Sequence, residues 1–198
     1  MITELLVGMG RTMAEEVTRI LDELFQDHRN MTLVLDLIER ESLCIRDDSA
    51  ADFDLLQDIM QYMAVYPDAV HHPKEDRLYE ELKLAHPEWT GGFERISLDH
   101  HNIAEQGRKL RDAFAAVQSD ALVNRERLAD EALQYVNNLR NHMQWEELDL
   151  FERCRAMATQ GHRFVTHDRV ESKSDPLFGR SVHSAYERLF EHIKSARR

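Results

Sequence analysis

The stretches His71-His72-Pro73-Lys74-Glu75 and His142-Met143-Gln144-Trp145-Glu146 decide the fold of this chain, because each places a histidine four residues ahead of a glutamate. On an α-helix this spacing puts both side chains on one face, about one turn apart, where they can bind the same ion. A lone histidine precedes each pair at nearly the same distance, His28 by 43 residues (71 − 28) and His100 by 42 residues (142 − 100). The chain therefore repeats one unit twice.

The residues around these histidines follow the period of an amphipathic helix. Apolar side chains recur in alternating steps of four and three, and each of the four histidines lies within such a stripe. A stripe of this kind marks the side of a helix that faces a core. The pattern predicts four long helices, whose first residues lie near Ala14, Ala50, Ile96 and Asn124.

Two prolines interrupt the second of these helices. Pro67 and Pro73 each lack a backbone N–H and clash with the preceding helical turn. We therefore expect a kink or a break between Tyr66 and Pro73, beside the first His-x-x-x-Glu pair. The stretch from His86 to Gly92 contains one proline and two glycines and is interpreted as the main turn between the two repeats.

Composition limits the class of protein. The 198 residues are 42% hydrophobic, which suits one domain of ordinary size, and only 7 Gly and 4 Pro favour helices over a turn-rich β architecture. A net charge of −12 argues against nucleic acid or an anionic membrane as a partner. Cys44 and Cys154 show no disulfide spacing and are interpreted as buried thiols. The chain opens without a secretion signal and lacks an apolar run of about 20 residues, so we expect a soluble, cytoplasmic protein.

Four helices with inward stripes and short connections predict an all-α fold, an antiparallel up-down-up-down four-helix bundle with an additional C-terminal helix. The bundle is expected to occupy residues 1–158, with its core at 15–158. Residues 159–180 are interpreted as a linker or wrapping loop, and residues 181–198 as an amphipathic helix that docks on the bundle or forms a homodimer contact. The apolar side of that helix comprises Val182, Tyr186, Leu189, Phe190 and Ile193.

The inward stripes bring four histidines and two glutamates to the interior of the bundle. A lone histidine on an apolar face is usually a core residue satisfied by a neighbour. Two ionised glutamates without partners, however, would cost several kcal/mol each to bury, and a metal removes that cost. Six protein ligands exceed the needs of one tetrahedral zinc ion and include no thiolate, so they favour a pair of iron or manganese ions. The candidate metal ligands are His28, His71, Glu75, His100, His142 and Glu146.

The order of these residues resembles the hemerythrin-like, or HHE cation-binding, domain over roughly residues 15–158. The resemblance implies that two iron ions bind, with two histidines as terminal ligands of each ion. Glu75 and Glu146 would bridge the ions together with an oxo or hydroxo group. Manganese or zinc could replace the iron.

Neighbouring residues leave the register of two ligands open. His72 with Asp76 repeats the four-residue spacing one position along, and His101 adjoins His100. The repeat interval favours His71 and His100, so His72, Asp76 and His101 are interpreted as surface groups or as groups that orient a ligand. The remaining histidines lie outside the repeated unit and are interpreted as surface or loop residues: His86, His162, His167, His183 and His192.

Ala104 narrows the function that the resemblance implies. Oxygen-carrying hemerythrins have a histidine at this position, four residues after the ligand on the third helix. We therefore expect a non-haem di-iron protein that binds or reacts with O2, NO or peroxide, in a redox or nitrosative stress response or in sensing. The alternative is a module for iron storage, delivery or sensing, and a weaker one is a purely structural bundle. The sequence shows no catalytic triad and no phosphate-binding loop, so it leaves open whether the protein is an enzyme.

Overall fold

The computed structural model describes residues 13–159 and 174–196, and within these ranges the chain forms helices and no strand. This confirms the predicted all-α class. The helices begin close to the predicted positions, because the apolar period identifies long amphipathic helices well. The α-helices are α1 (Met13–Arg46), α2 (Phe53–Val65), α3 (His72–Ala85), α4 (Ile96–Gln118), α5 (Arg125–Trp145), α6 (Phe151–Thr159) and α7 (Glu187–Ala196).

Side-chain caps determine where two of the helices begin. Asp52 accepts a hydrogen bond from the backbone N–H of Leu55 at 2.8 Å, so α2 begins at Phe53 rather than near Ala50. Asn124 caps α5 in the same way, which agrees with the predicted start of that helix. Such caps satisfy backbone donors that lack a partner within the helix.

π-helical turns interrupt two of the long helical segments. The predicted irregularity after α2 is a π-turn, η1 (Pro67–His71), in which the N–H groups of Val70 and His71 both donate to the carbonyl of Tyr66. A second π-turn, η4 (Glu146–Leu150), joins α5 to α6, and its sequence contains no proline that would predict it. π-turns of this kind occur frequently at functional sites. Here each one contains a candidate ligand.

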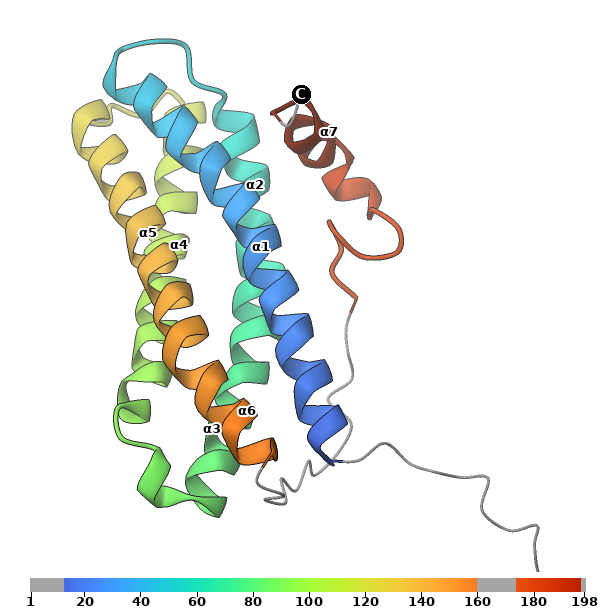
Figure 1. The fold of residues 1–198 in the computed structure, drawn as a ribbon. Coiled ribbons are helices and arrows are strands. Elements are labelled where there is room, and N and C mark those ends of the chain that lie inside the picture. The colour runs from blue at the N-terminus through green and yellow to red at the C-terminus, as the bar shows by residue number, and fades with distance from the viewer. Residues whose placement is uncertain (1–12, 160–173, 197–198) are drawn as a thin grey trace, which may run out of the picture.

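The long helices lie side by side as a bundle (Figure 1). α1 packs against α5 and α6, α2 packs against α4, and α4 packs against α5. The apolar core falls into two clusters, one around Leu35, Tyr62 and Phe114 and the other around Leu21 and Phe151. The four histidines and two glutamates that interrupt the apolar stripes separate the residues of one cluster from those of the other along each helix.

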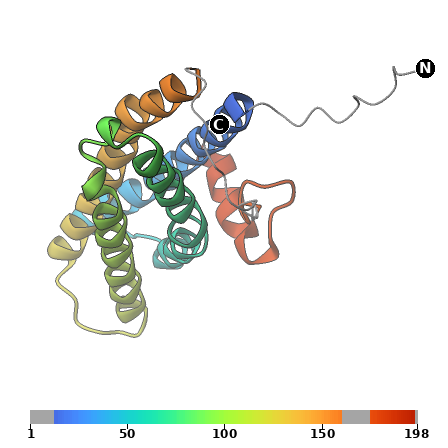
Figure 2. The ribbon, with the colours of Figure 1, turned by 90° about the horizontal axis from the view of Figure 1, so that it is seen from below.

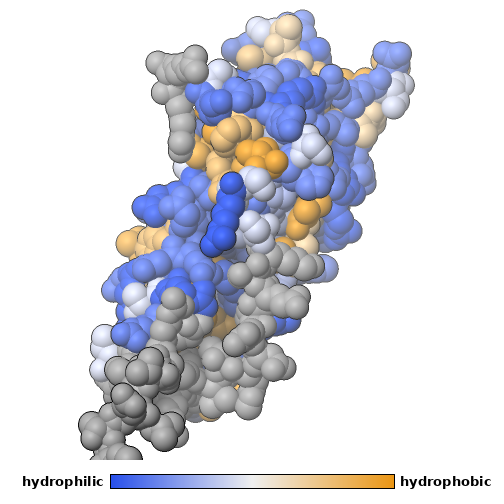
Figure 3. Space-filling view, turned by 90° about the vertical axis from the view of Figure 1, so that its right-hand side faces the viewer, coloured by the Kyte–Doolittle hydropathy of each residue, from blue (hydrophilic) through white to orange (hydrophobic). Residues whose placement is uncertain are grey.

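The C-terminal segment docks on the outside of the bundle. A 3-10 turn, η5 (Ser184–Tyr186), leads into α7, which contacts α1 and α2 (Figure 2). The helix begins at Glu187 rather than near Ser181. Tyr186, Leu189 and Ile193 are buried against the bundle, as the predicted apolar side requires. The side of the molecule that carries this segment is mostly hydrophilic, with apolar residues in small patches (Figure 3).

The two cysteines and the apolar character of the helices agree in most respects with the prediction from composition. Cys44 and Cys154 are both free thiols, and Cys154 is buried as predicted, whereas Cys44 is half-buried. Among the described helices, none combines the length and the apolar character that crossing a membrane requires. Most of the predicted linker, residues 160–173, lies outside the described residues.

Candidate metal centre

The six predicted ligand residues come together in the interior of the bundle. α1 provides a histidine, the end of η1 and the first turn of α3 provide the first His-x-x-x-Glu pair, and α4 provides another histidine. α5 and the start of η4 provide the second pair. None of these side chains is more than 7% exposed: His28, His71, Glu75, His100, His142 and Glu146.

Glu75 lies between histidines from three helical segments. Its Oε1 atom is 3.4 Å from Nε2 of His28 and 3.3 Å from Nε2 of His71. Its Oε2 atom is 3.5 Å from Nε2 of His100. The two oxygens of one fully buried carboxylate therefore face two different groups of imidazoles.

Glu146 has a matching arrangement. Its Oε2 atom is 3.4 Å from Nε2 of His142 and 3.6 Å from Nε2 of His28, and its Oε1 atom is 3.5 Å from Nε2 of His100. Tyr79 donates a hydrogen bond to the same Oε1 at 3.3 Å. The second carboxylate thus also spans the space between imidazoles of different helices.

The atoms that face this space lack hydrogen-bond partners. Among the described residues, Nε2 of all four histidines, both oxygens of Glu75 and Oε2 of Glu146 are buried without one. Each unsatisfied buried polar atom costs on the order of 1–3 kcal/mol, so such a convergence is costly unless something binds there. Imidazole nitrogens and carboxylate oxygens are the ligands of iron, manganese and zinc. The donor set therefore fits a metal, and two carboxylates among four imidazoles can serve two ions.

The family comparison addresses the same residues. The model of the hemerythrin HHE cation binding domain matches residues 19–154, a range that contains all six candidate ligands. The chain belongs to the hemerythrin HHE family. Searches of curated proteins and of solved structures found no match.

Carboxylates orient three of the histidines of this hemerythrin domain from behind. In each case Nδ1 lies at hydrogen-bond distance from a carboxylate oxygen, which leaves Nε2 free to face the centre. The pairs are His71 with Asp27 at 3.1 Å, His28 with Glu147 at 3.0 Å and His100 with Asp76 at 3.0 Å. The fourth histidine differs, because Nδ1 of His142 has no hydrogen-bond partner among the described residues.

The sequence pattern predicts one of these three carboxylates. The spacing of Asp76 from His72 predicts a surface group or one that orients a ligand, and Asp76 contacts His100. Asp27 and Glu147 were missed, although each adjoins a candidate ligand in the sequence. Their partners lie 44 and 119 residues away in the chain, so the helical period of their own segments carries no sign of the contact.

Charge balance in the metal-free centre shifts the pKa values of the histidines. Burial lowers the pKa of His28 and of His100, but the carboxylates around them outweigh it and raise each pKa to about 10. Burial dominates for His142, whose pKa falls to about 4. Burial opposes ionisation of Glu75, but the positive charges of the neighbouring His71 and His28 outweigh it and hold the pKa well below its usual range. Protons thus balance the carboxylate charge where a cation would otherwise do so.

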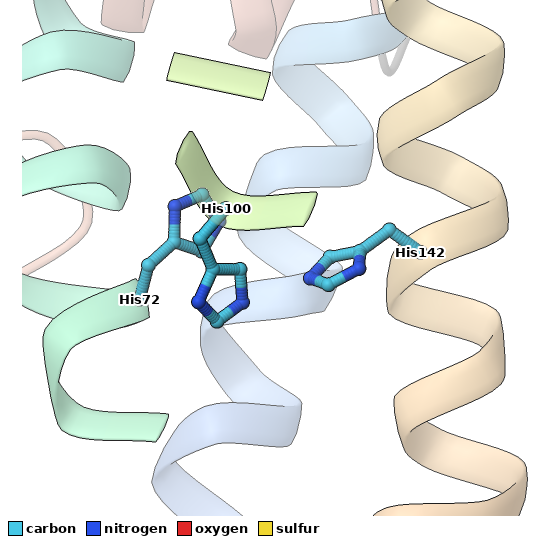
Figure 4. Close-up of side chains that lie close together, drawn as sticks. All are labelled: His72, His100 and His142. Atoms are coloured by element: carbon cyan, nitrogen blue, oxygen red, sulfur yellow. The ribbon is translucent and has the colours of Figure 1, made fainter. Parts of the chain in front are cut away.

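His72 is the residue whose interpretation the hemerythrin fold corrects. It is 3% exposed, so the surface alternative is wrong, while the alternative of a group beside the ligands agrees with its burial. Its ring stacks on that of His100, with centroids 4.3 Å apart and planes 11° apart, and lies 6.1 Å from that of His142 (Figure 4). Burial and the neighbouring histidines lower its pKa well below the usual value. His101, in contrast, is exposed as predicted.

The other histidines lie away from the centre where the structure describes them. His183 is exposed, and His86 and His192 are half-buried. His162 and His167 lie outside the described residues.

A cavity of about 280 Å³ lies between α4 and α5, at one side of the candidate centre of the hemerythrin domain. Its lining is largely polar, and a hydrogen bond of 3.0 Å from Asn138 to Gln106 crosses between the two helices. His142 lines this cavity, which makes it the candidate ligand that a small molecule from solvent meets there.

Proposed function

We propose that this hemerythrin domain is a non-haem di-iron protein that binds or reacts with a small diatomic molecule or oxidant: O2, NO or peroxide. The observation that carries the proposal is the convergence of unpaired nitrogen and oxygen atoms on one buried point. The antiparallel up-down-up-down topology, the presence of two ions and the choice of iron are all part of the proposal.

The distances support an assignment of ligands to each ion. His28 and His71 share proximity to Oε1 of Glu75, so we assign them to the first ion. His100 and His142 are both close to Glu146 and are assigned to the second ion. The two glutamates lie within reach of both groups and are assigned as bridges.

The two pairs of histidines differ in their access to solvent. Two ferrous ions side by side can each supply one electron to a bound oxidant. The ring of Phe151 stacks on His28 at 5.4 Å and limits access of water to the first pair of histidines. The polar cavity beside His142 lets a small molecule approach the second pair. The protein thereby directs an oxidant to one side of the centre.

Ala104 supports a reaction or a sensing role over reversible oxygen carriage. It is half-buried on α4, one turn after His100, where the oxygen-carrying hemerythrins place a histidine. A role in redox or nitrosative stress within the cytoplasm belongs to this proposal. The net charge of −12 favours a small-molecule partner over a nucleic acid.

Anaerobic loading with ferrous iron tests the proposal. The expected result is about two irons per chain and, after exposure to air or NO, a new charge-transfer absorption from the bridged pair. Glu75→Gln is the matched variant, because it retains side-chain volume and removes the charge of the bridge. Correctly folded wild-type protein that binds no pair of ions would overturn the proposal.

A second candidate function is sensing, in which the metal state alters the C-terminal segment. The motivating contacts run outward from the centre: Asp27 accepts hydrogen bonds from His71 and from Tyr66, and the ring of Tyr66 stacks on that of Tyr62 at 6.3 Å. Tyr62 in turn donates to Asp175, at the start of the segment that ends in α7.

Hydrogen exchange of α7 separates the two functions. If the protein is a sensor, hydrogen exchange in α7 should differ between the metal-free and the metal-loaded protein. If the domain only binds an oxidant, no such difference is required. The same measurement tests whether residues 181–198 behave as a unit apart from residues 1–158. A homodimer through α7 is a further proposal, which sedimentation with and without metal would test.

A further inference from the structure

His72 faces the same pair of histidines that we assign to the second ion. Its ring lies parallel to that of His100 and nearly perpendicular, at 86°, to that of His142. The three residues each offer a ring nitrogen, and these atoms lie within 4.8 Å of one another. All three side chains are at least nine-tenths buried, and Figure 4 shows them gathered in one place from three helices.

The backbone explains how two adjacent histidines both point inward. Successive side chains on a helix diverge by about 100°, because one turn holds 3.6 residues. His71 ends the π-turn and points towards His28, with ring centroids 5.0 Å apart. His72 begins α3 and therefore points to the other side, towards α4 and His100. Adjacent residues thus serve opposite halves of the centre.

His72 also has a carboxylate behind it, as three of the proposed ligands do. Its Nδ1 atom lies 3.5 Å from Oδ1 of Asp68, a buried oxygen that has no hydrogen-bond partner among the described residues. This repeats the relationship of Asp27 to His71 and of Asp76 to His100 at a somewhat longer distance. A carboxylate at Nδ1 leaves Nε2 as the atom available to a metal.

We propose that His72 is a fifth histidine ligand, bound to the ion that His100 and His142 hold; this rests on the proposed di-iron function. The second ion then has three imidazoles and the first has two. In this proposal His72, at the start of α3, supplies the fifth imidazole that oxygen-carrying hemerythrins take from the position of Ala104 on α4.

Two variants of His72 separate ligation from packing. His72→Phe keeps an aromatic ring stacked on His100 but has no ring nitrogen, and His72→Leu removes both features. His101→Leu is the matched control, since His101 is exposed and adjoins His100 in sequence. Near-infrared magnetic circular dichroism of the diferrous protein reports the coordination number at each iron, independently of any activity.

We expect both His72 variants to lose one ligand at one ferrous site and to bind the second iron more weakly, by about tenfold or more, which corresponds to about 1.4 kcal/mol. His101→Leu should match the wild type. A spectrum of His72→Phe that superimposes on the wild type would overturn the proposal. If a His72 variant fails to fold, His72→Gly with added imidazole replaces it, and recovery of the wild-type spectrum supports ligation while its persistent absence contradicts it.

The same series distinguishes failure of this proposal from failure of the proposed function. His142→Leu removes a ligand that the di-iron function itself requires. If this variant loses the second iron while His72→Phe keeps the wild-type spectrum, the centre stands and His72 is a packing residue. If wild-type protein binds no pair of irons, both proposals fail.

Discussion

The carboxylate of Asp27 contacts both His71 and Tyr66, because it accepts a hydrogen bond from Nδ1 of His71 at 3.1 Å and one from the hydroxyl of Tyr66, which lies 3.2 Å from each carboxylate oxygen. Residues that hold a ligand histidine in this way typically contribute 10–100-fold to metal affinity. We expect Asp27→Ala to weaken iron binding by a factor in that range, as measured by competition with a chelator. Asp22→Asn, an exposed carboxylate on the same helix, is the control. Equal affinity of the two variants would contradict the orienting role of Asp27.

Metal binding should release protons. In the metal-free centre the pKa of His28 and of His100 is about 10, so both are protonated at pH 7, and each must lose its proton to bind a metal. His142, with a pKa of about 4, is already neutral. Despite burial, the pKa of His71 is also raised, by the charge of Glu75 and by its contact with Asp27, so we expect release of at least two protons per metal pair and an affinity that increases from pH 7 to pH 9. Titration calorimetry in buffers of different protonation enthalpy measures the release, and a value of zero would contradict it.

The same two histidines predict the pH dependence of metal-free stability. Their pKa values are raised on folding, so their contribution to the free energy of unfolding is complete below the ordinary pKa of 6.5. It is lost as the pH rises through about 10. The melting temperature of metal-free protein should therefore fall between pH 7 and pH 10, while the stabilisation by bound metal grows. A melting temperature that rises over this range would argue against the protonated centre.

The hydrogen bond from Tyr62 to Asp175 is expected to hold the C-terminal segment on the bundle. The hydroxyl and the carboxylate are 3.0 Å apart and buried, so Tyr62→Phe leaves the carboxylate without this donor. We expect a loss of about 1–3 kcal/mol in the free energy of unfolding, together with faster hydrogen exchange in α7.

Tyr186→Phe is the control for that measurement. Tyr186 packs edge-on against Tyr62, with centroids 5.9 Å apart, and within the described residues its hydroxyl has no hydrogen bond. Its removal should change stability less than Tyr62→Phe does. Equal effects of the two variants would show that ring packing, rather than the hydrogen bond, retains the segment.

The cavity beside His142 should control the rate of ligand entry. Asn138→Phe places a bulky ring in a space of about 280 Å³ and removes the hydrogen bond to Gln106. We expect NO to bind about tenfold more slowly, a barrier increase of about 1.4 kcal/mol, with unchanged iron content. Asn137→Phe, at the adjacent and exposed position, is the matched control, and stopped-flow absorbance measures both rates. An unchanged rate for Asn138→Phe would place the entry route elsewhere.

The sequence predicted the helices and the residues that converge, and it did so for one physical reason. A histidine or glutamate in an otherwise apolar stripe must lie in the core, so the stripes that define the helices also reveal His28, His100 and the two pairs. That argument extends only along a single helix. The contact of His28 with Glu147 joins residues 119 positions apart, so it cannot be predicted from the spacing of residues within either helix.

The inward position of His72 was missed for a related reason. A uniform helical period assigns adjacent residues to different faces, and with one face taken as the core, only His71 or His72 could lie inside. In a bundle, however, a helix contacts neighbours on two sides, so two adjacent residues can both be buried. Proline revealed the first π-turn, whereas Glu146–Leu150 contains no proline or glycine that could reveal the second.

The π-turns also make the centre depend on the number of residues in the chain as well as on their identity. Each π-turn holds one residue more than the α-helical turn it replaces, and that residue rotates everything after it by about 100°. Deletion of a single codon from the first four residues of this turn, 67–70, would restore the α-helical period and turn His71 and Glu75 away from their partners, without altering any ligand. In this chain a one-codon change in length is therefore a route by which the bundle can lose its proposed metal centre while every ligand residue is still present in the gene.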